Sequence, residues 1–172
     1  MKASVFCTTK TVDQAENIVL QLQQAGFLSD DISALLPDKR GTKDFAHEHN
    51  TKAPEGATTG GIAGLGVGAA LGWLAGIGAL AIPGVGPFIA AGPIMAALGG
   101  AAVGTATGGI VGALVGLGIP EFEAKRYDAK IREGNILISV HTEDSKQRDV
   151  AKEVFERNHA DDISSAGEAS AN

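Results

Sequence analysis

The sequence predicts an α+β fold: a ferredoxin-like βαβ-βαβ sandwich interrupted by a long Gly/Ala-rich two-helix hairpin. Three observations predict it. The first and last parts of the chain repeat one strand–helix–strand pattern, and both contain the tetrapeptide Asp-Asp-Ile-Ser. The 65 residues from Gly56 to Pro120 contain no Asp, Glu, Lys, Arg or His. The chain is therefore a charged globular part with an uncharged insert.

The first strand–helix–strand unit occupies residues 1–38. Residues 3–8 are short, β-branched and aromatic, which favours a strand. Thr11 stands three residues before a glutamine, the spacing of a capping box, and apolar residues at steps of three and four follow to residue 25. We expect this helix to end at Gly26 in the left-handed conformation. Residues 30–36 then form a second strand before a proline.

The second unit, 135–165, repeats the first. Residues 135–142 alternate isoleucine or valine with other side chains, as a strand does. Asp144 precedes Gln147 at the helix-start spacing, and an apolar stripe follows it at Val150, Ala151, Val154 and Phe155. The Asp-Asp-Ile-Ser tetrapeptide then recurs at 161–164, in the place that 30–33 occupies in the first unit. The matching context indicates an internal duplication.

Two such units in one small domain favour a ferredoxin-like sandwich, in which two helices cover one face of four antiparallel strands. A long insertion between the halves is tolerated, because loop-closure entropy grows slowly with length. The predicted order is a first half at 1–38, a polar linker at 39–57, the hairpin at 58–119, a charged connector helix at 120–134, a second half at 135–165 and a disordered tail at 166–172.

The insert carries two ladders of glycines at four-residue steps. They are Gly60, Gly64, Gly68, Gly72 and Gly76, and then Gly100, Gly104, Gly108, Gly112 and Gly116. A four-residue step places each ladder on one helix face, where small residues let helices approach closely. Between the ladders, Pro83-Gly84-Val85-Gly86-Pro87 predicts the turn of a helical hairpin. The ten ladder glycines are thus candidate helix–helix association sites, and Pro83, Gly84, Gly86 and Pro87 are the candidate turn.

The length and polarity of the two predicted helices favour a membrane pair. Residues 60–82 and 94–119 are each longer than the roughly 20 residues that cross a bilayer. Basic residues flank both ends and the turn has no charge, so the positive-inside rule places the globular domain and both termini in the cytoplasm, at the inner membrane. The alternative is a cytoplasmic protein whose hairpins are buried in a large homo-oligomer.

The connector after Pro120 predicts a charged helix closed by Gly134, with Glu121–Lys125 and Asp128–Arg132 as four-residue ion pairs. One interpretation is a solvated link back to the sheet. The other is a helix lying on lipid headgroups, with Tyr127 as its anchor.

No residue pattern indicates catalysis, a cofactor or a metal. The net charge of −6 argues against nucleic acid as a partner. His47 and His49 lie in the polar linker with no further ligand nearby, and Cys7 lies in the first strand, where a packed thiol is expected. We expect a non-enzymatic protein whose partners are the lipid bilayer or other copies of itself.

The stretch 52–127, above all Leu71 to Ile94 and Gly118 to Tyr127, resembles small bacterial general stress proteins, induced by heat or low temperature, with a glycine-zipper hairpin. The resemblance implies a stress-response role without enzymatic activity. The predicted function is therefore a membrane-associated stress protein that self-associates through the hairpin. The alternatives are the soluble assembly and a module that senses a ligand on the open sheet face.

Overall fold

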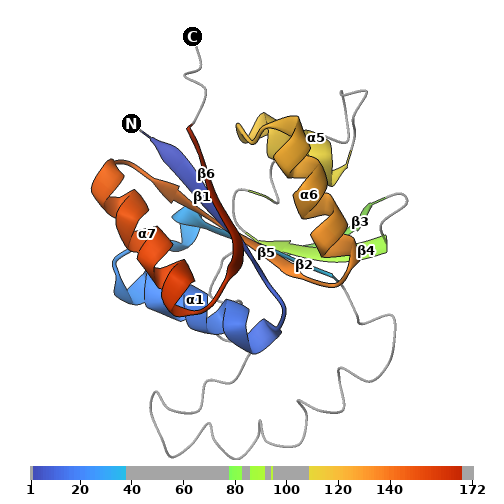
Figure 1. The fold of residues 1–172 in the computed structure, drawn as a ribbon. Helices are drawn as coiled ribbons and strands as arrows, with labels where there is room; N and C mark the ends of the chain where they lie inside the picture. Colours follow the sequence, from blue (N-terminus) through green and yellow to red (C-terminus); the bar gives the residue numbers. More distant parts are fainter. Residues whose placement is uncertain (1, 38–77, 83–85, 92–93, 95–108, 168–172) are drawn as a thin grey trace, which may run out of the picture.

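The computed structural model of the chain describes residues 2–37, 78–82, 86–91, 94 and 109–167. These residues form one sheet in the order β3-β4-β2-β5-β1-β6, with every neighbouring pair antiparallel (Figure 1). The predicted α+β class is confirmed.

Each terminal region forms the predicted strand–helix–strand unit. The first comprises β1 (Ala3–Thr9), α1 (Val12–Gln24), the short 3₁₀ helix η1 (Ser29–Asp31) and β2 (Ile32–Pro37). The second comprises β5 (Ile136–Thr142), α7 (Ser145–Arg157) and β6 (Asp161–Gly167). Because β1 pairs with both β5 and β6, and β2 pairs with β5, the two units interleave in one sheet.

The two helices of these units begin with the same pair of hydrogen bonds. Thr11 Oγ1 accepts from the N–H of Gln14 at 3.2 Å, and Gln14 Oε1 accepts from the N–H of Lys10 at 3.1 Å. In α7, Asp144 Oδ1 accepts from the N–H of Gln147 at 2.8 Å, and the Gln147 carboxamide accepts at 2.8 Å from the residue before Asp144. Each glutamine thus reaches one residue further back than in a capping box.

The two helices also end alike. Gly26 follows α1 with φ of +97°, the predicted left-handed conformation, and His159 follows α7 with φ of +54°. In both places the next N–H closes a six-residue loop onto the helix, as in a Schellman motif. Because α1 and α7 begin and end with the same hydrogen-bond patterns, they support the duplication that the repeated tetrapeptide suggests.

The middle of the chain departs from the predicted helical hairpin. Residues 78–82 form β3 (Gly78–Ile82), where the sequence predicted the end of a helix, and β4 (Gly86–Ala91) pairs with β3 and with β2. The predicted reversal at Pro83–Pro87 therefore joins two strands, and Gly86 and Pro87 belong to β4. The edge of β2 offers unpaired backbone groups, and a segment of weak helix propensity gains more by pairing with them.

The second predicted helix, 94–119, is short where the structure describes it. Gly109 has φ of +87°, α5 (Ile110–Gly116) follows, and Gly118 with φ of +92° ends the turn after it. The connector helix α6 (Glu121–Arg132) begins after Pro120 and closes at Gly134 as predicted. The rest of the predicted hairpin, 58–77, 83–85, 92–93 and 95–108, lies outside the described residues.

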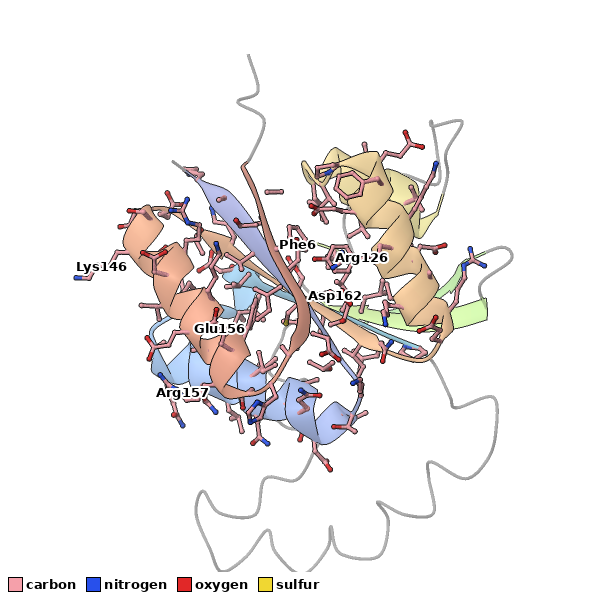
Figure 2. All side chains as sticks on the ribbon, in the orientation of Figure 1. Phe6, Arg126, Lys146, Glu156, Arg157 and Asp162 are labelled. Atoms are coloured by element: carbon pink, nitrogen blue, oxygen red, sulfur yellow. The ribbon has the colours of Figure 1, made fainter. Side chains whose placement is uncertain are left out.

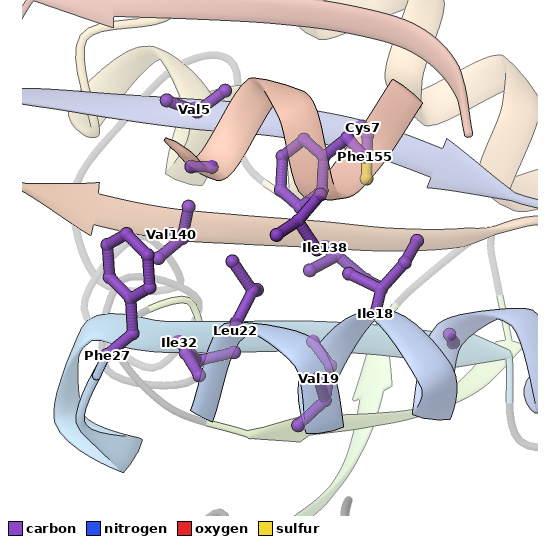
Figure 3. Packing of buried hydrophobic residues seen from close by; sticks show 14 of the residues in the cluster. Val5, Cys7, Ile18, Val19, Leu22, Phe27, Ile32, Ile138, Val140 and Phe155 are labelled. Atoms are coloured by element: carbon purple, nitrogen blue, oxygen red, sulfur yellow. The ribbon is translucent and has the colours of Figure 1, made fainter. Parts of the chain in front are cut away.

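Two apolar cores lie on opposite faces of the sheet, because successive strand residues face opposite ways. On one face Val5, Cys7, Ile138 and Val140 pack against α1 and α7 (Figure 3). On the other face the second core includes Phe6, Leu35 and Leu137 of the sheet, with Leu114 of α5 and Tyr127 and Ile131 of α6. The second face was expected to be open, and α5 and α6 cover it.

Candidate functional site

The predicted association sites are the ladder glycines, of which Gly112 and Gly116 lie in the described part of the chain, both in α5. A Cβ placed on Gly116 would meet no atom within 4 Å. Among the described residues, no helix therefore makes the close approach at Gly116 that a ladder glycine permits. The other eight ladder glycines, together with Pro83 and Gly84, lie outside the described residues.

Helix α6 holds the exit of the uncharged segment against the sheet. Tyr127 is 1% exposed, and its ring centroid lies 6.2 Å from that of Phe6 on β1. Its hydroxyl donates to the carbonyl oxygen of Asp162 at 2.7 Å and lies 2.7 Å from Ser164 Oγ. Burial raises the pKa of Tyr127 to about 12. Since Tyr127 faces the sheet, the second interpretation of this helix, in which Tyr127 is a lipid anchor, is wrong.

Asp162 is the centre of this junction. It has φ of +52°, and the pairing of β1 with β6 shifts register opposite it, between Phe6 and Thr8. Its Oδ1 accepts from Arg126 Nη2 at 2.5 Å, and its Oδ2 accepts from Thr8 Oγ1 at 3.2 Å. Figure 2 shows Arg126 and Asp162 facing each other between α6 and β6. The carboxylate thus joins α6, β1 and β6.

Sequence reasoning used Asp161–Asp162 only as part of the repeated tetrapeptide and missed this role. The available signal was the repeated tetrapeptide, whose first copy lies partly in η1, whereas the second begins β6. The predicted four-residue pairs on α6 are confirmed: Lys125 Nζ lies 2.7 Å from Glu121, and Arg132 Nε lies 2.8 Å from Asp128.

Apolar side chains are exposed on the two helices that end the uncharged segment. Phe122 at the start of α6 is 70% exposed and Val115 on α5 is 41% exposed. We call these two exposed side chains, together with Gly116, the α5–α6 surface. Exposed apolar side chains are available for contact with another apolar body.

The remaining candidate groups do not converge. Cys7 is fully buried as predicted, and burial raises the pKa of its thiol well above the usual value, which makes it a poor nucleophile. Among the residues that the structure describes, no three His, Cys, Asp or Glu side chains are placed to hold a metal ion. His47 and His49 lie outside those residues.

Within the described ranges, no helix combines the length and the apolar character that a membrane crossing needs. Comparison of the chain with models of protein families, with curated proteins and with solved structures finds no match.

Proposed function

We propose that the protein is a non-enzymatic stress-response scaffold that self-associates through its uncharged segment, 56–120, which a ferredoxin-like domain presents. The observation that carries the proposal is the absence of any charge over 65 residues that contain ten glycines in two four-step ladders. A segment of this composition has no charged side chain for water to solvate. Its glycine faces allow close packing against the same segment of another copy.

The connections between this segment and the domain support the proposal. Strand β4 pairs with β2, and α5 and α6 pack on the second sheet face, so the segment is tied to the domain at several places. The strand order β2-β5-β1-β6, with α1 and α7 on one face, supports the ferredoxin-like part of the proposal. The uncovered α5–α6 surface adjoins the segment and leaves apolar area for a second copy. The resemblance to bacterial general stress proteins supports the stress-response part.

The test is the mass of the particle in solution after substitution in both ladders. Gly68→Leu with Gly108→Leu places large side chains on both glycine faces, so we expect a smaller particle by sedimentation or light scattering. Gly167→Leu is the control, because Gly167 lies outside the segment and no atom would meet its Cβ within 4 Å. An unchanged mass of the double variant, or an equal effect of the control, refutes self-association through the ladders.

Membrane association is the second candidate, and the absence of charge over residues 56–77 favours it. Because β2 and β4 on either side of these 22 residues pair in one sheet, the segment can enter a bilayer only as a loop that returns to the same side. Residues 78–82 and 110–116, by contrast, belong to the sheet and its cover, so the predicted pair of long spans cannot use them. Recovery in a carbonate-washed membrane pellet supports this candidate, and a detergent-free soluble particle supports the first.

A further inference from the structure

A cavity of about 200 Å³ opens at one end of the second sheet face. Its lining comes from three adjacent strands, the approach to β2 and the end of α5: Ser4, Asp30, Asp31, Ser33, Leu117, Ser139 and His141. We propose that this cavity binds a small organic cation through a primary ammonium group.

The floor of the cavity is a row of hydroxyl groups. Ser33 on β2 pairs with Ser139 on β5, and Ser4 on β1 pairs with His141, so these side chains share one face. Ser33 Oγ accepts from the N–H of Ile94 at 3.2 Å. Ser4 and Ser139 are 8% and 5% exposed, and neither side chain hydrogen-bonds to another described residue. Both residues line the cavity, so a polar group bound there can hydrogen-bond to their hydroxyl groups.

The charge at the cavity selects a cation. Asp30 and Asp31 are adjacent residues that line the cavity just before β2 begins. The next residue, Ile32, pairs with Val140 of β5. Asp31 Oδ2 accepts from the N–H of Leu28 at 3.2 Å, which holds its carboxylate in place. Two neighbouring carboxylates repel an anion. They can accept hydrogen bonds from the three N–H donors of an ammonium group, and the hydroxyl oxygens of the serines can accept from these donors too.

Glu143 beside the lining already has partners of its own. Its Oε1 lies 3.1 Å from Lys2 Nζ and 3.3 Å from His141 Nε2, so Asp30 and Asp31 are the carboxylates that supply the negative charge of the cavity. In the part of the chain that the structure describes, no set of three metal ligands accompanies these groups, so an organic cation fits better than a metal ion.

The size of the cavity and its one apolar wall define the class further. Its volume is below the roughly 300–1,000 Å³ of pockets that hold drug-sized ligands, which favours a ligand of only a few heavy atoms. Leu117 at the end of α5 supplies an apolar wall for a short methylene chain. A small amino alcohol has this shape: an ammonium group for the carboxylates, a hydroxyl group for the serines and methylenes for Leu117.

The test uses three probes of one length with charges of +1, 0 and −1: 3-amino-1-propanol, 1,3-propanediol and 3-hydroxypropanoate at matched ionic strength. Backbone amide shifts of the full chain are followed by NMR. We expect saturable shifts at Ser4, Ser33 and Ser139 with the amine alone, in the millimolar range typical of so small a ligand. Equal response to the diol, saturation by the acid, or no saturable shift with any probe overturns the proposal.

Variants locate the contact. Asp30→Asn should raise the Kd of the amine about tenfold, and Ser139→Ala about threefold, because a charge-assisted hydrogen bond is stronger than a neutral one. The repeat supplies a matched control: Asp161→Asn alters the corresponding aspartate of the second tetrapeptide, outside the cavity, and should leave the Kd unchanged. An unchanged Kd in Asp30→Asn refutes the ammonium site even if Ser139→Ala fails to fold, since Asp30 is exposed and makes no hydrogen bond that the fold needs within the described ranges.

Discussion

The Tyr127 hydroxyl donates to the main-chain carbonyl of Asp162 across 2.7 Å, and this contact joins helix α6 to the edge strand β6. Asp162 in turn accepts from the neighbouring Arg126 through its carboxylate. The exit of the uncharged segment is therefore tied to the second copy of the repeated tetrapeptide. Because the contact is formed by a buried hydroxyl, its removal has a measurable cost.

Tyr127→Phe should lower the free energy of unfolding by about 1–2 kcal/mol, since the Asp162 carbonyl and Ser164 Oγ each lose a partner in a buried place. Urea unfolding measures the change. Phe122→Leu on the same helix is the control and should change stability by less than about 0.5 kcal/mol, because Phe122 is mostly exposed. Equal effects of the two substitutions would show that the hydroxyl contacts are unimportant.

Tyr127 should titrate at a pKa of about 12 in the folded protein, because burial disfavours its phenolate. It is the single tyrosine of the chain, so phenolate absorbance reports it alone. The folded pKa is raised above the unfolded value of about 10. The unfolded state thus releases this proton first, and stability is constant below about pH 10 and falls between about pH 10 and 12. A folded protein that titrates at pH 10 contradicts the burial of this hydroxyl.

Substitutions of Asp162 should separate its backbone role from its charge. Asn tolerates the left-handed conformation, so Asp162→Asn loses only the charged acceptor of Arg126. The free energy of unfolding should fall by about 1 kcal/mol. Asp162→Ala also places an ordinary side chain at φ of +52°, which should add about 1 kcal/mol. Asp161→Ala is the control, because Asp161 forms only an exposed ion pair with Lys10. Its substitution should lower the free energy of unfolding by less than about 0.5 kcal/mol. Thermal unfolding gives the order of stability of the three variants. Equal stability of Asp162→Ala and Asp162→Asn would refute the backbone role.

Glu16 on α1 is 8% exposed, its Oε1 has no hydrogen-bond partner among the described residues, and burial together with Asp13 raises its pKa to about 7. A carboxyl group with a raised folded pKa binds its proton more tightly in the folded state. The stability that Glu16 contributes should therefore be fully present below about pH 4.5 and be lost as pH rises to about 7.

Glu16→Gln should remove this slope and should be more stable than the parent chain at pH 8 by about 1 kcal/mol, a value below the full shift because solvent near the helix surface screens the charge. Denaturant unfolding at several pH values measures it. Parallel pH profiles of the parent and the variant would show that Glu16 ionises normally.

Gly116→Ala tests whether a second copy uses the α5 glycine face. Within the chain a Cβ at Gly116 meets open space, so alanine should stabilise α5 by about 0.5–1 kcal/mol through helix propensity. If a partner packs closely on Gly116, the particle should at the same time become smaller or dissociate more readily. Stabilisation without any change in particle mass would exclude Gly116 from the interface.

Several local features were predictable because neighbouring residues decide them. The start of α1 at Thr11 and its end at Gly26 follow from side chains that satisfy nearby backbone groups. The alternation of β5 and the apolar stripe of α7 follow from residue spacing. Glu16 stands four residues after Val12 and three before Val19, so spacing places it beside the apolar stripe, but the packing of α1 decides that its carboxylate is buried without a partner among the described residues.

The sequence by itself determined the two strand–helix–strand units, their caps, the repeated tetrapeptide and the limits of the uncharged segment, because short-range hydrogen bonds and periodic burial require only local information. Tertiary structure alone decided that Gly78–Ile82 extends the sheet and that α6 covers its second face through Tyr127 and Asp162. A glycine-rich segment has little conformational preference of its own, so its structure depends on which distant strand edge or sheet face is available to it.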